Sequence, residues 1–207
     1  MIDTFFGMLA ESFDLPILDW LQANLQSGFM DFIMPIITLF GDAGIFWIAC
    51  AVVLLFFPKT RKIGLSMGIA MAMGLLVCNV TLKPLVARIR PYDFQIKELG
   101  KTWNDILLAG KLLVETPHDF SFPSGHTIAS FEAATVLLIN NKKFKVGIPA
   151  LILAILIAFS RLYLYVHYPT DVIASVILGT LFALIGNALA GLIAPKMRFG
   201  KKGKYEA

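Results

Sequence analysis

Long apolar runs with few or no charges constrain this chain more than any other feature of its sequence. About 20 helical residues cross a hydrocarbon core of about 30 Å, and a backbone inside lipid must satisfy its own hydrogen bonds, so such spans are helices. Six runs approach this length, and they cover residues 29–40, 43–57, 63–82, 125–140, 146–166 and 172–195. The sequence therefore predicts an all-α, polytopic membrane bundle of six transmembrane helices, or of five if the short first run does not cross.

The composition excludes several other classes of protein. Apolar residues make up 57% of the 207 residues and charged residues 15%, against about 45–50% and about 25% in soluble proteins. The mean hydropathy is +0.76. A soluble globule of this length could not bury so much apolar surface, and the composition also excludes a disordered chain, a coiled coil and a nucleic-acid-binding module. We therefore expect one membrane domain over residues 1–207, in which residues 1–27 form an amphipathic segment at the membrane surface.

The basic residues predict how the bundle is oriented. They gather between the second and third runs, between the fourth and fifth, and after the sixth, in residues 59–62, 142–145 and 196–204. With six spans, all three groups and the N-terminus share one side, which the positive-inside rule makes cytoplasmic. Residues 91–123 then form an external loop, and residues 196–207 form a basic cytoplasmic tail of a multi-pass protein in the cell membrane.

Ionisable side chains gather at the outward ends of the predicted spans, where they are costly in lipid and therefore usually functional. Three of these side chains are the cations Lys83, Arg90 and Arg161. The forked guanidinium of arginine and the point charge of lysine both suit phosphate oxygens. The sequence Pro-Ser-Gly-His at 123–126 opens a helix whose N–H groups favour an anion, while Ser124 adds a hydroxyl and Gly125 allows a close approach to the backbone. Together these residues predict a phosphate-binding site.

Two histidines at the same end suit proton transfer or nucleophilic attack. In the sequence His-Tyr-Pro-Thr-Asp at 167–171, Pro169 fits the first position of a helix, so that Asp171 can reach back to the ring of His167. A carboxylate on one ring nitrogen leaves a lone pair on the other, which makes His167 a base or a nucleophile. His126 has no acidic neighbour in the sequence, and it suits a general acid that protonates the leaving oxygen.

Three motifs with fixed spacing carry these residues. They are Lys-x6-Arg-Pro at 83–91, Pro-Ser-Gly-His at 123–126 and Ser-Arg-x5-His-x3-Asp at 160–171. The complete set resembles the signature of the phosphatidic acid phosphatase type 2 superfamily. This resemblance implies a phosphatase that needs no metal or other cofactor and that forms a phosphohistidine intermediate.

The resemblance also implies a role for each matching residue. His167 would be the nucleophile, Asp171 would orient it, and His126 would protonate the leaving group and later activate water. Five further residues would hold the phosphoryl oxygens, namely Lys83, Arg90, Ser124, Gly125 and Arg161.

An outward-facing site inside a membrane bundle suits a lipid phosphate as the substrate, with membrane lipids as its surroundings. The candidates are undecaprenyl diphosphate, phosphatidylglycerol phosphate and phosphatidate, and the sequence leaves this choice and the oligomeric state open. One alternative is an anion or lipid transporter that uses the same basic cluster, although transporter sites usually lie near the membrane midplane, between repeats.

Two further alternatives use the same side chains. A serine hydrolase could use Ser124, His167 and Asp171, but the chain lacks the Gly-x-Ser-x-Gly turn of such enzymes. A zinc site could use His118, His126 and His167, but their spacing is not typical of zinc ligands.

Overall fold

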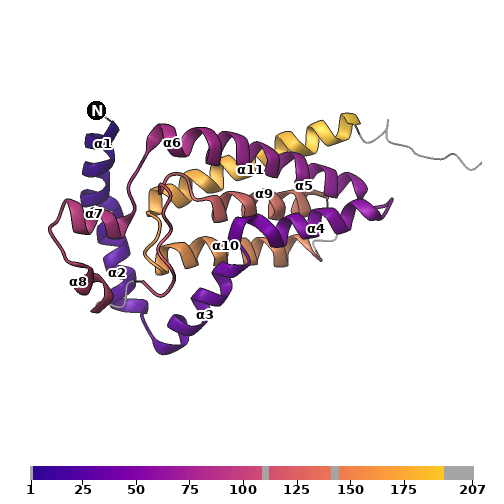
Figure 1. Cartoon of the computed structure of the whole chain (residues 1–207). Helices are drawn as coiled ribbons and strands as arrows, with labels where there is room; N and C mark the ends of the chain where they lie inside the picture. The colour runs from indigo at the N-terminus through magenta and orange to yellow at the C-terminus, as the bar shows by residue number, and fades with distance from the viewer. Residues whose placement is uncertain (1, 109–111, 141–144, 194–207) are drawn as a thin grey trace, which may run out of the picture.

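Five helices run side by side in the computed structural model, which describes residues 2–108, 112–140 and 145–193 (Figure 1). They are α4 (Ile45–Phe56), α5 (Arg61–Met73), α9 (Gly125–Asn140), α10 (Gly147–Tyr163) and α11 (Pro169–Ile193). Helix α9 lies in the middle and packs against α11, α10 and α5. All regular structure in the described part of the chain is helical, which confirms the predicted all-α class.

Small residues allow the helices around α9 to approach closely. Ala133 and Ala134 of α9 are fully buried. A Cβ atom on Gly179 of α11 would lie 2.9 Å from the backbone oxygen of Ile128 in α9, so a larger residue would push the two helices apart. Such contacts between small residues are typical of helices that pack in membranes.

Three helical segments are long and apolar enough to cross a membrane: Gly28–Phe56, Arg61–Lys97 and Pro169–Ile193. Gly147–Tyr163 is a shorter apolar helix. The predicted number of six crossings is not confirmed. Runs 29–40 and 43–57, which were expected to cross separately, form α3 (Gly28–Leu39) and α4 within the first long segment, joined by the short 3₁₀ turn η2 (Asp42–Gly44). Figure 1 shows α3 leading into α4.

The N-terminal helices lie at the end of the bundle that carries the predicted site. They are α1 (Ile2–Leu9), the π-helical turn η1 (Ala10–Asp14) and α2 (Leu15–Leu25), and Figure 1 shows them across that end. Asp14 accepts hydrogen bonds from Arg88 Nη2 at 2.7 Å and from the backbone N–H of Thr170 at 2.9 Å. We predicted an N-terminus on the opposite side of the membrane from the site, whereas these contacts place the N-terminal helices at the same end of the bundle as the site. The physical reason for this difference is that run 29–40 continues with run 43–57 in one long helical segment, Gly28–Phe56.

The structure describes the three basic groups of the sequence only in part. Residues 59–62 lie at the α4–α5 turn, at the end of the bundle opposite the N-terminal helices. The predicted tail 196–207 and most of residues 142–145 lie outside the described residues. The surface-bound character of residues 1–27 stays a prediction.

The chain between α5 and α9 forms the segment that covers the site. Helix α5 continues into the π-helix η3 (Gly74–Leu82) and α6 (Lys83–Val86), and Ala87 ends this stretch with a left-handed φ of 50°. An extended segment follows, and then the short helices α7 (Pro91–Lys97) and α8 (Trp103–Leu108). The predicted loop 91–123 thus contains helical turns, and it returns to α9 along Arg88, whose backbone oxygen accepts from the N–H of Ser121 at 2.7 Å.

Candidate active site

A cavity of about 560 Å³ collects most of the predicted site residues. Its polar end is lined by Lys83, Arg90, Gly125, His126, Arg161 and His167. The two other predicted residues, Ser124 and Asp171, are fully buried and do not line the cavity. The structure therefore brings together residues from α6, the extended segment before α7, α9, α10 and the turn before α11.

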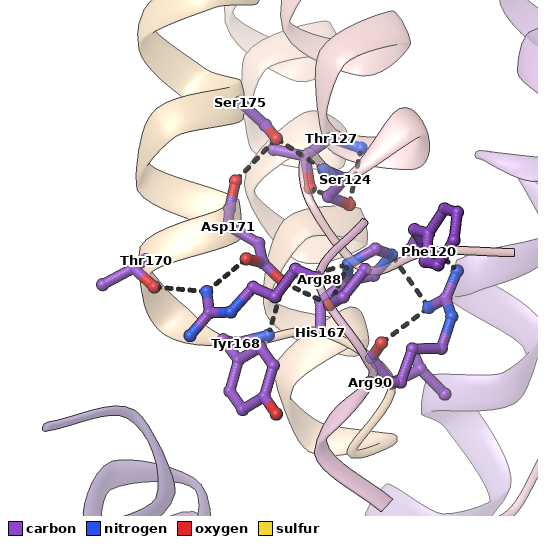
Figure 2. A network of polar contacts seen from close by, with 12 residues as sticks. Arg88, Arg90, Phe120, Ser124, Thr127, His167, Tyr168, Thr170, Asp171 and Ser175 are labelled. Carbon is purple, nitrogen blue, oxygen red and sulfur yellow. Dashed lines mark hydrogen bonds and ion pairs between the residues drawn. The ribbon is translucent and has the colours of Figure 1, made fainter. Parts of the chain in front are cut away.

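His167 lies between a carboxylate and a guanidinium, as Figure 2 shows. Its Nδ1 atom is 3.5 Å from Asp171 Oδ2 and 3.5 Å from the hydroxyl of Ser121. Its Nε2 atom is 3.3 Å from Arg90 Nη1. Asp171 reaches back as expected, because Oδ2 also accepts from the backbone N–H of Tyr168 at 3.1 Å.

The surroundings of His167 favour its neutral form. Burial lowers the pKa of His167 well below its usual value, and the charges of Arg90, Arg161 and Lys83 lower it further. A neutral imidazole with Nδ1 directed at a carboxylate carries its lone pair on Nε2. That nitrogen is on the side of Arg90 and the cavity.

Arg88 is a central residue that the sequence did not single out for the site. Its side chain is 3% exposed and forms ion pairs with Asp171 at 2.5 Å and with Asp14 at 2.7 Å. The guanidinium carbon also lies 3.7 Å from the ring centroid of Tyr168, which adds a cation–π contact. Arg88 therefore binds the N-terminal segment to the carboxylate behind His167. Position in the Lys-x6-Arg-Pro motif gives no sign of this role, because Asp14 is far away in the sequence.

Lys83 and Arg90 share one carboxylate, that of Asp119. Lys83 Nζ pairs with Oδ2, and Arg90 Nη2 donates to Oδ1 at 2.5 Å. Arg90 is held further by the backbone oxygens of Asp119 at 2.8 Å and Val166 at 2.6 Å. Partial burial would raise the pKa of Asp119, but Lys83 and Arg90 outweigh it and lower the pKa to about 2.

Arg161 keeps part of its donor capacity unused. Its side chain is buried, and Nη1 donates to the hydroxyl of Thr38 in α3 at 2.6 Å. Its Nε atom is buried without a hydrogen-bond partner among the described residues. Because an unpaired buried donor is costly and Arg161 is one of the residues that line the cavity, this residue favours an anionic ligand there.

Ser124 caps the start of α9. Its hydroxyl accepts from the Thr127 hydroxyl at 3.0 Å and from the Thr127 N–H at 3.5 Å, which is the usual pattern of a helix N-cap. Its own backbone N–H donates to the hydroxyl of Ser175 at 2.8 Å. Of the Pro-Ser-Gly-His motif, Gly125 and His126 therefore reach the cavity, while Ser124 lies behind them. The serine-hydrolase alternative has no support from this placement.

His126 has an acidic partner that the local sequence does not reveal. Its Nε2 atom lies 2.6 Å from Oδ1 of Asp42, in the turn between α3 and α4. No sequence motif marks Asp42, and 84 positions separate the two residues. Over the described residues, no three His, Cys, Asp or Glu side chains form a group that could hold a metal ion, so the zinc site of His118, His126 and His167 is not formed there.

Known proteins are similar to this chain over the region that carries the three motifs. The PAP2 superfamily matches residues 59–191. The chain is 35% identical to an undecaprenyl-diphosphatase of Sulfolobus acidocaldarius over 134 residues, which cover 65% of this chain and 58% of that protein. It is 32% identical to phosphatidylglycerophosphatase B of Bacillus subtilis over 163 residues, covering 74% and 66%. The chain thus spans a little over half the length of the first relative.

Two solved structures share the fold. The crystal structure of Aquifex aeolicus LpxE has a TM-score of 0.68 at 23% identity and covers 84% of this chain and 94% of that chain. A PAP2-type phosphatidylglycerolphosphate phosphatase from Bacillus subtilis has a TM-score of 0.64 at 25% identity and covers 96% and 97%. With the three motifs in place and the family match over more than half of its length, the chain belongs to the PAP2 superfamily.

Proposed function

We propose that the chain is a metal-independent membrane phosphatase that hydrolyses a lipid phosphate or diphosphate through a phosphohistidine intermediate. The observation that carries this proposal is the shape and lining of the one cavity described above. The same cavity holds two histidines and three cations at its polar end, and it continues as an apolar groove along the helices.

The groove suits the hydrocarbon tail of a substrate. It runs between α4 and α5, and its lining includes Ile48, Val52, Leu55, Gly64, Gly68 and Leu75. Lys83 and Gly64 lie on one continuous helical stretch that is partly π-helical, so at about 1.5 Å per α-helical residue they are at most roughly 28 Å apart. This length is close to the thickness of the hydrocarbon core of a bilayer. A soluble phosphate would need no groove of this kind.

In the first chemical step, His167 Nε2 attacks phosphorus with its lone pair. A P–N bond forms, the bond between phosphorus and the leaving oxygen breaks, and that oxygen takes a proton from His126. In the second step His126 removes a proton from water, the resulting hydroxide attacks phosphorus, and the P–N bond breaks. Asp171 holds the proton on Nδ1 of His167 throughout and stabilises the charge that the ring acquires.

The cations supply the electrostatic stabilisation that phosphoryl transfer requires. Charge accumulates on the three equatorial oxygens in the transition state, and catalysis depends on fixed positive groups around them. Lys83, Arg90 and Arg161 offer such groups without a metal ion. The carboxylate of Asp119, held between Lys83 and Arg90, has the charge and the position that we expect of two phosphoryl oxygens of the substrate.

We infer the side of the membrane that the site faces from the positions of basic residues, and the candidate substrates from the relatives of the chain. The basic residues 59–62 lie at the end opposite the site, and the positive-inside rule supports a cytoplasmic location for that end. The site then faces outward, together with the N-terminal helices. The names of the relatives support undecaprenyl diphosphate and phosphatidylglycerol phosphate as substrates to test first.

The test is release of inorganic phosphate from a panel of lipid phosphates and diphosphates in detergent with EDTA. We expect hydrolysis of at least one lipid by the wild type, and loss of it in His167→Ala. His118→Ala is the matched control, because His118 does not line the cavity. If no lipid in the panel is hydrolysed, or if EDTA abolishes hydrolysis, the proposal is wrong. Binding of the same lipids without turnover would favour the transporter alternative.

A further inference from the structure

We propose that Asp42 is the positioning residue of His126, a role that rests on the phosphatase function proposed above. His126 Nε2–H donates to Asp42 Oδ1 at 2.6 Å. The site therefore contains two pairs of histidine and carboxylate, one for each chemical role. Asp171 belongs to the nucleophile, and Asp42 belongs to the acid and base.

The turn that carries Asp42 is shaped around the ring of His126. A Cβ atom on Gly41 would lie 2.7 Å from His126 Cδ2 and 2.9 Å from Ile157 Cγ2, so only glycine fits there. The two residues after Asp42 both have left-handed backbone angles, with φ of 47° at Ala43 and 67° at Gly44. An alanine in this conformation is strained, and strained backbone is concentrated at functional sites.

Both flanks of the turn are tied to the catalytic helices. On the α3 side, the hydroxyl of Thr38 accepts from Arg161 Nη1 at 2.6 Å. On the α4 side, Trp47 Nε1 donates to the hydroxyl of Ser130 at 3.0 Å, one helical turn beyond His126. Because these contacts lie on either side of Asp42, the backbone of the turn is held beside His126, and the 52% exposed side chain of Asp42 reaches the ring from there.

The hydrogen bond between His126 and Asp42 determines which ring nitrogen of His126 transfers the proton. With Nε2–H bound to Asp42, Nδ1 is the nitrogen through which His126 exchanges a proton. It gives this proton to the leaving oxygen and later takes one from water, while Nε2 keeps its own proton in both forms of the ring. The carboxylate of Asp42 offsets the repulsion between the protonated ring and the nearby Arg161. This is how an orienting carboxylate supports a catalytic histidine.

The first test compares two leaving groups. Asp42→Asn keeps the size of the side chain but replaces the charge, so we expect kcat/KM, which reports only the steps up to the phosphohistidine, to fall by about 30- to 300-fold for a lipid monophosphate, whose leaving group is an alcohol. For p-nitrophenyl phosphate, whose leaving oxygen needs little protonation, we expect a fall of less than about fivefold. An equal fall with both substrates would overturn the proposal, because a merely structural role would not distinguish them.

The second test is a double-mutant cycle measured with a lipid diphosphate, for which His126→Ala is expected to keep a measurable rate. If Asp42 acts through His126, then Asp42→Asn changes kcat by less than about twofold in the His126→Ala background. Multiplicative losses would overturn the proposal. Asp42→Glu, which retains the charge, should recover part of the lost rate and also covers the case in which Asp42→Asn folds poorly.

Asp31→Asn is the matched control. Asp31 lies in the same segment, near the start of α3, and accepts from the hydroxyl of Tyr163 at 2.5 Å, away from the cavity lining. We expect its kcat to stay within about twofold of wild type. The two proposals can fail separately. An inactive wild type refutes the phosphatase function, whereas an active wild type, an impaired His126→Ala and an unimpaired Asp42→Asn refute only the role of Asp42.

Discussion

Arg88 Nη1 donates to Asp171 Oδ1 at 2.5 Å, so the carboxylate behind His167 is itself held by a buried guanidinium. Its other oxygen, Oδ2, accepts from Ser121 and from the backbone of Tyr168. Asp171 therefore has a fixed position, and its negative charge is paired with Arg88. This arrangement makes the stability of the fold and the chemistry of His167 depend on the same ion pair.

We predict that Arg88→Ala destabilises the protein by about 3–5 kcal/mol, because it leaves Asp14 and Asp171 as buried carboxylates without their cation. Thermal unfolding in detergent measures the change. Adding Asp14→Asn should recover part of the loss, since one of the two buried charges is then removed. Arg61→Ala, at the opposite end of the bundle, is the matched control. An Arg88→Ala protein as stable as this control would contradict the prediction.

From the ion pairs of Asp119 we predict that replacing this residue changes KM. Its carboxylate pairs with two of the cations that we assign to the phosphate, and its side chain is 53% exposed, so it must give way when substrate binds. Asp119→Asn should therefore lower KM by about threefold to fivefold, the size expected for an exposed ion pair. Asp105→Asn, in α8 outside the cavity lining, should leave KM unchanged. A higher KM in Asp119→Asn would show that the carboxylate organises the site instead of competing for it.

The effect of Asp119 should not depend on pH in the usual range. A carboxyl group whose pKa is lowered on folding contributes stability above its unfolded pKa, and this contribution is lost as the pH falls through the folded pKa. For Asp119 the folded pKa is about 2, so the group stays ionised at pH 5–8. The ratio of KM between wild type and Asp119→Asn should be constant over that range. A ratio that approaches one towards pH 5 would contradict this assignment.

Glu132 is the one acidic residue of α9, and it lines the cavity beyond His126. It is 1% exposed, and its Oε1 atom has no hydrogen-bond partner among the described residues. We predict that Glu132→Gln keeps at least about half of the wild-type kcat, because the amide preserves the shape and most of the hydrogen-bonding capacity. Phosphate release measures it. A loss as large as that of His126→Ala would place the carboxylate in the chemistry.

The sequence predicted the parts of the site that depend on short separations. His167 and Asp171 are four positions apart at a helix start, so local geometry alone brings them together. The Lys-x6-Arg and Pro-Ser-Gly-His motifs likewise end or begin single helices. The Ser-x-x-Thr pattern at 124–127 could have identified Ser124 as an N-cap, because this spacing is typical of a capping side chain.

Contacts between distant segments could not be predicted in this way. Asp42 meets His126, and Asp14 meets Arg88, only because α3 and the N-terminal helices fold back onto the site. The structure places the N-terminal helices differently from the prediction for a related reason. Run 29–40 is short and contains Asp31 and Pro35, which argues against an independent crossing, but its place beside α10 depends on tertiary packing.

The revised topology gives a labelling pattern that differs from the one expected of six crossings. In a chain with Cys50 and Cys78 replaced by alanine, single cysteines at Glu11 and Thr102 should react with an impermeant reagent on intact cells. A cysteine at Lys59 should react only after the cells are opened. All three positions are exposed. Labelling of Lys59 together with Glu11, and not of Thr102, would contradict the shared end of the N-terminal helices and the site.

The covalent intermediate is the central claim, and the most direct measurement is to trap it. Wild-type protein is mixed with ³²P-labelled lipid phosphate in EDTA and quenched rapidly under alkaline conditions, in which phosphohistidine survives. We expect label on His167 in the wild type, a slower appearance of the same label in Asp171→Asn because the tautomer is no longer fixed, and none in His167→Ala. Phosphate release that continues in His167→Ala, or turnover by the wild type without any label on His167, would contradict the mechanism.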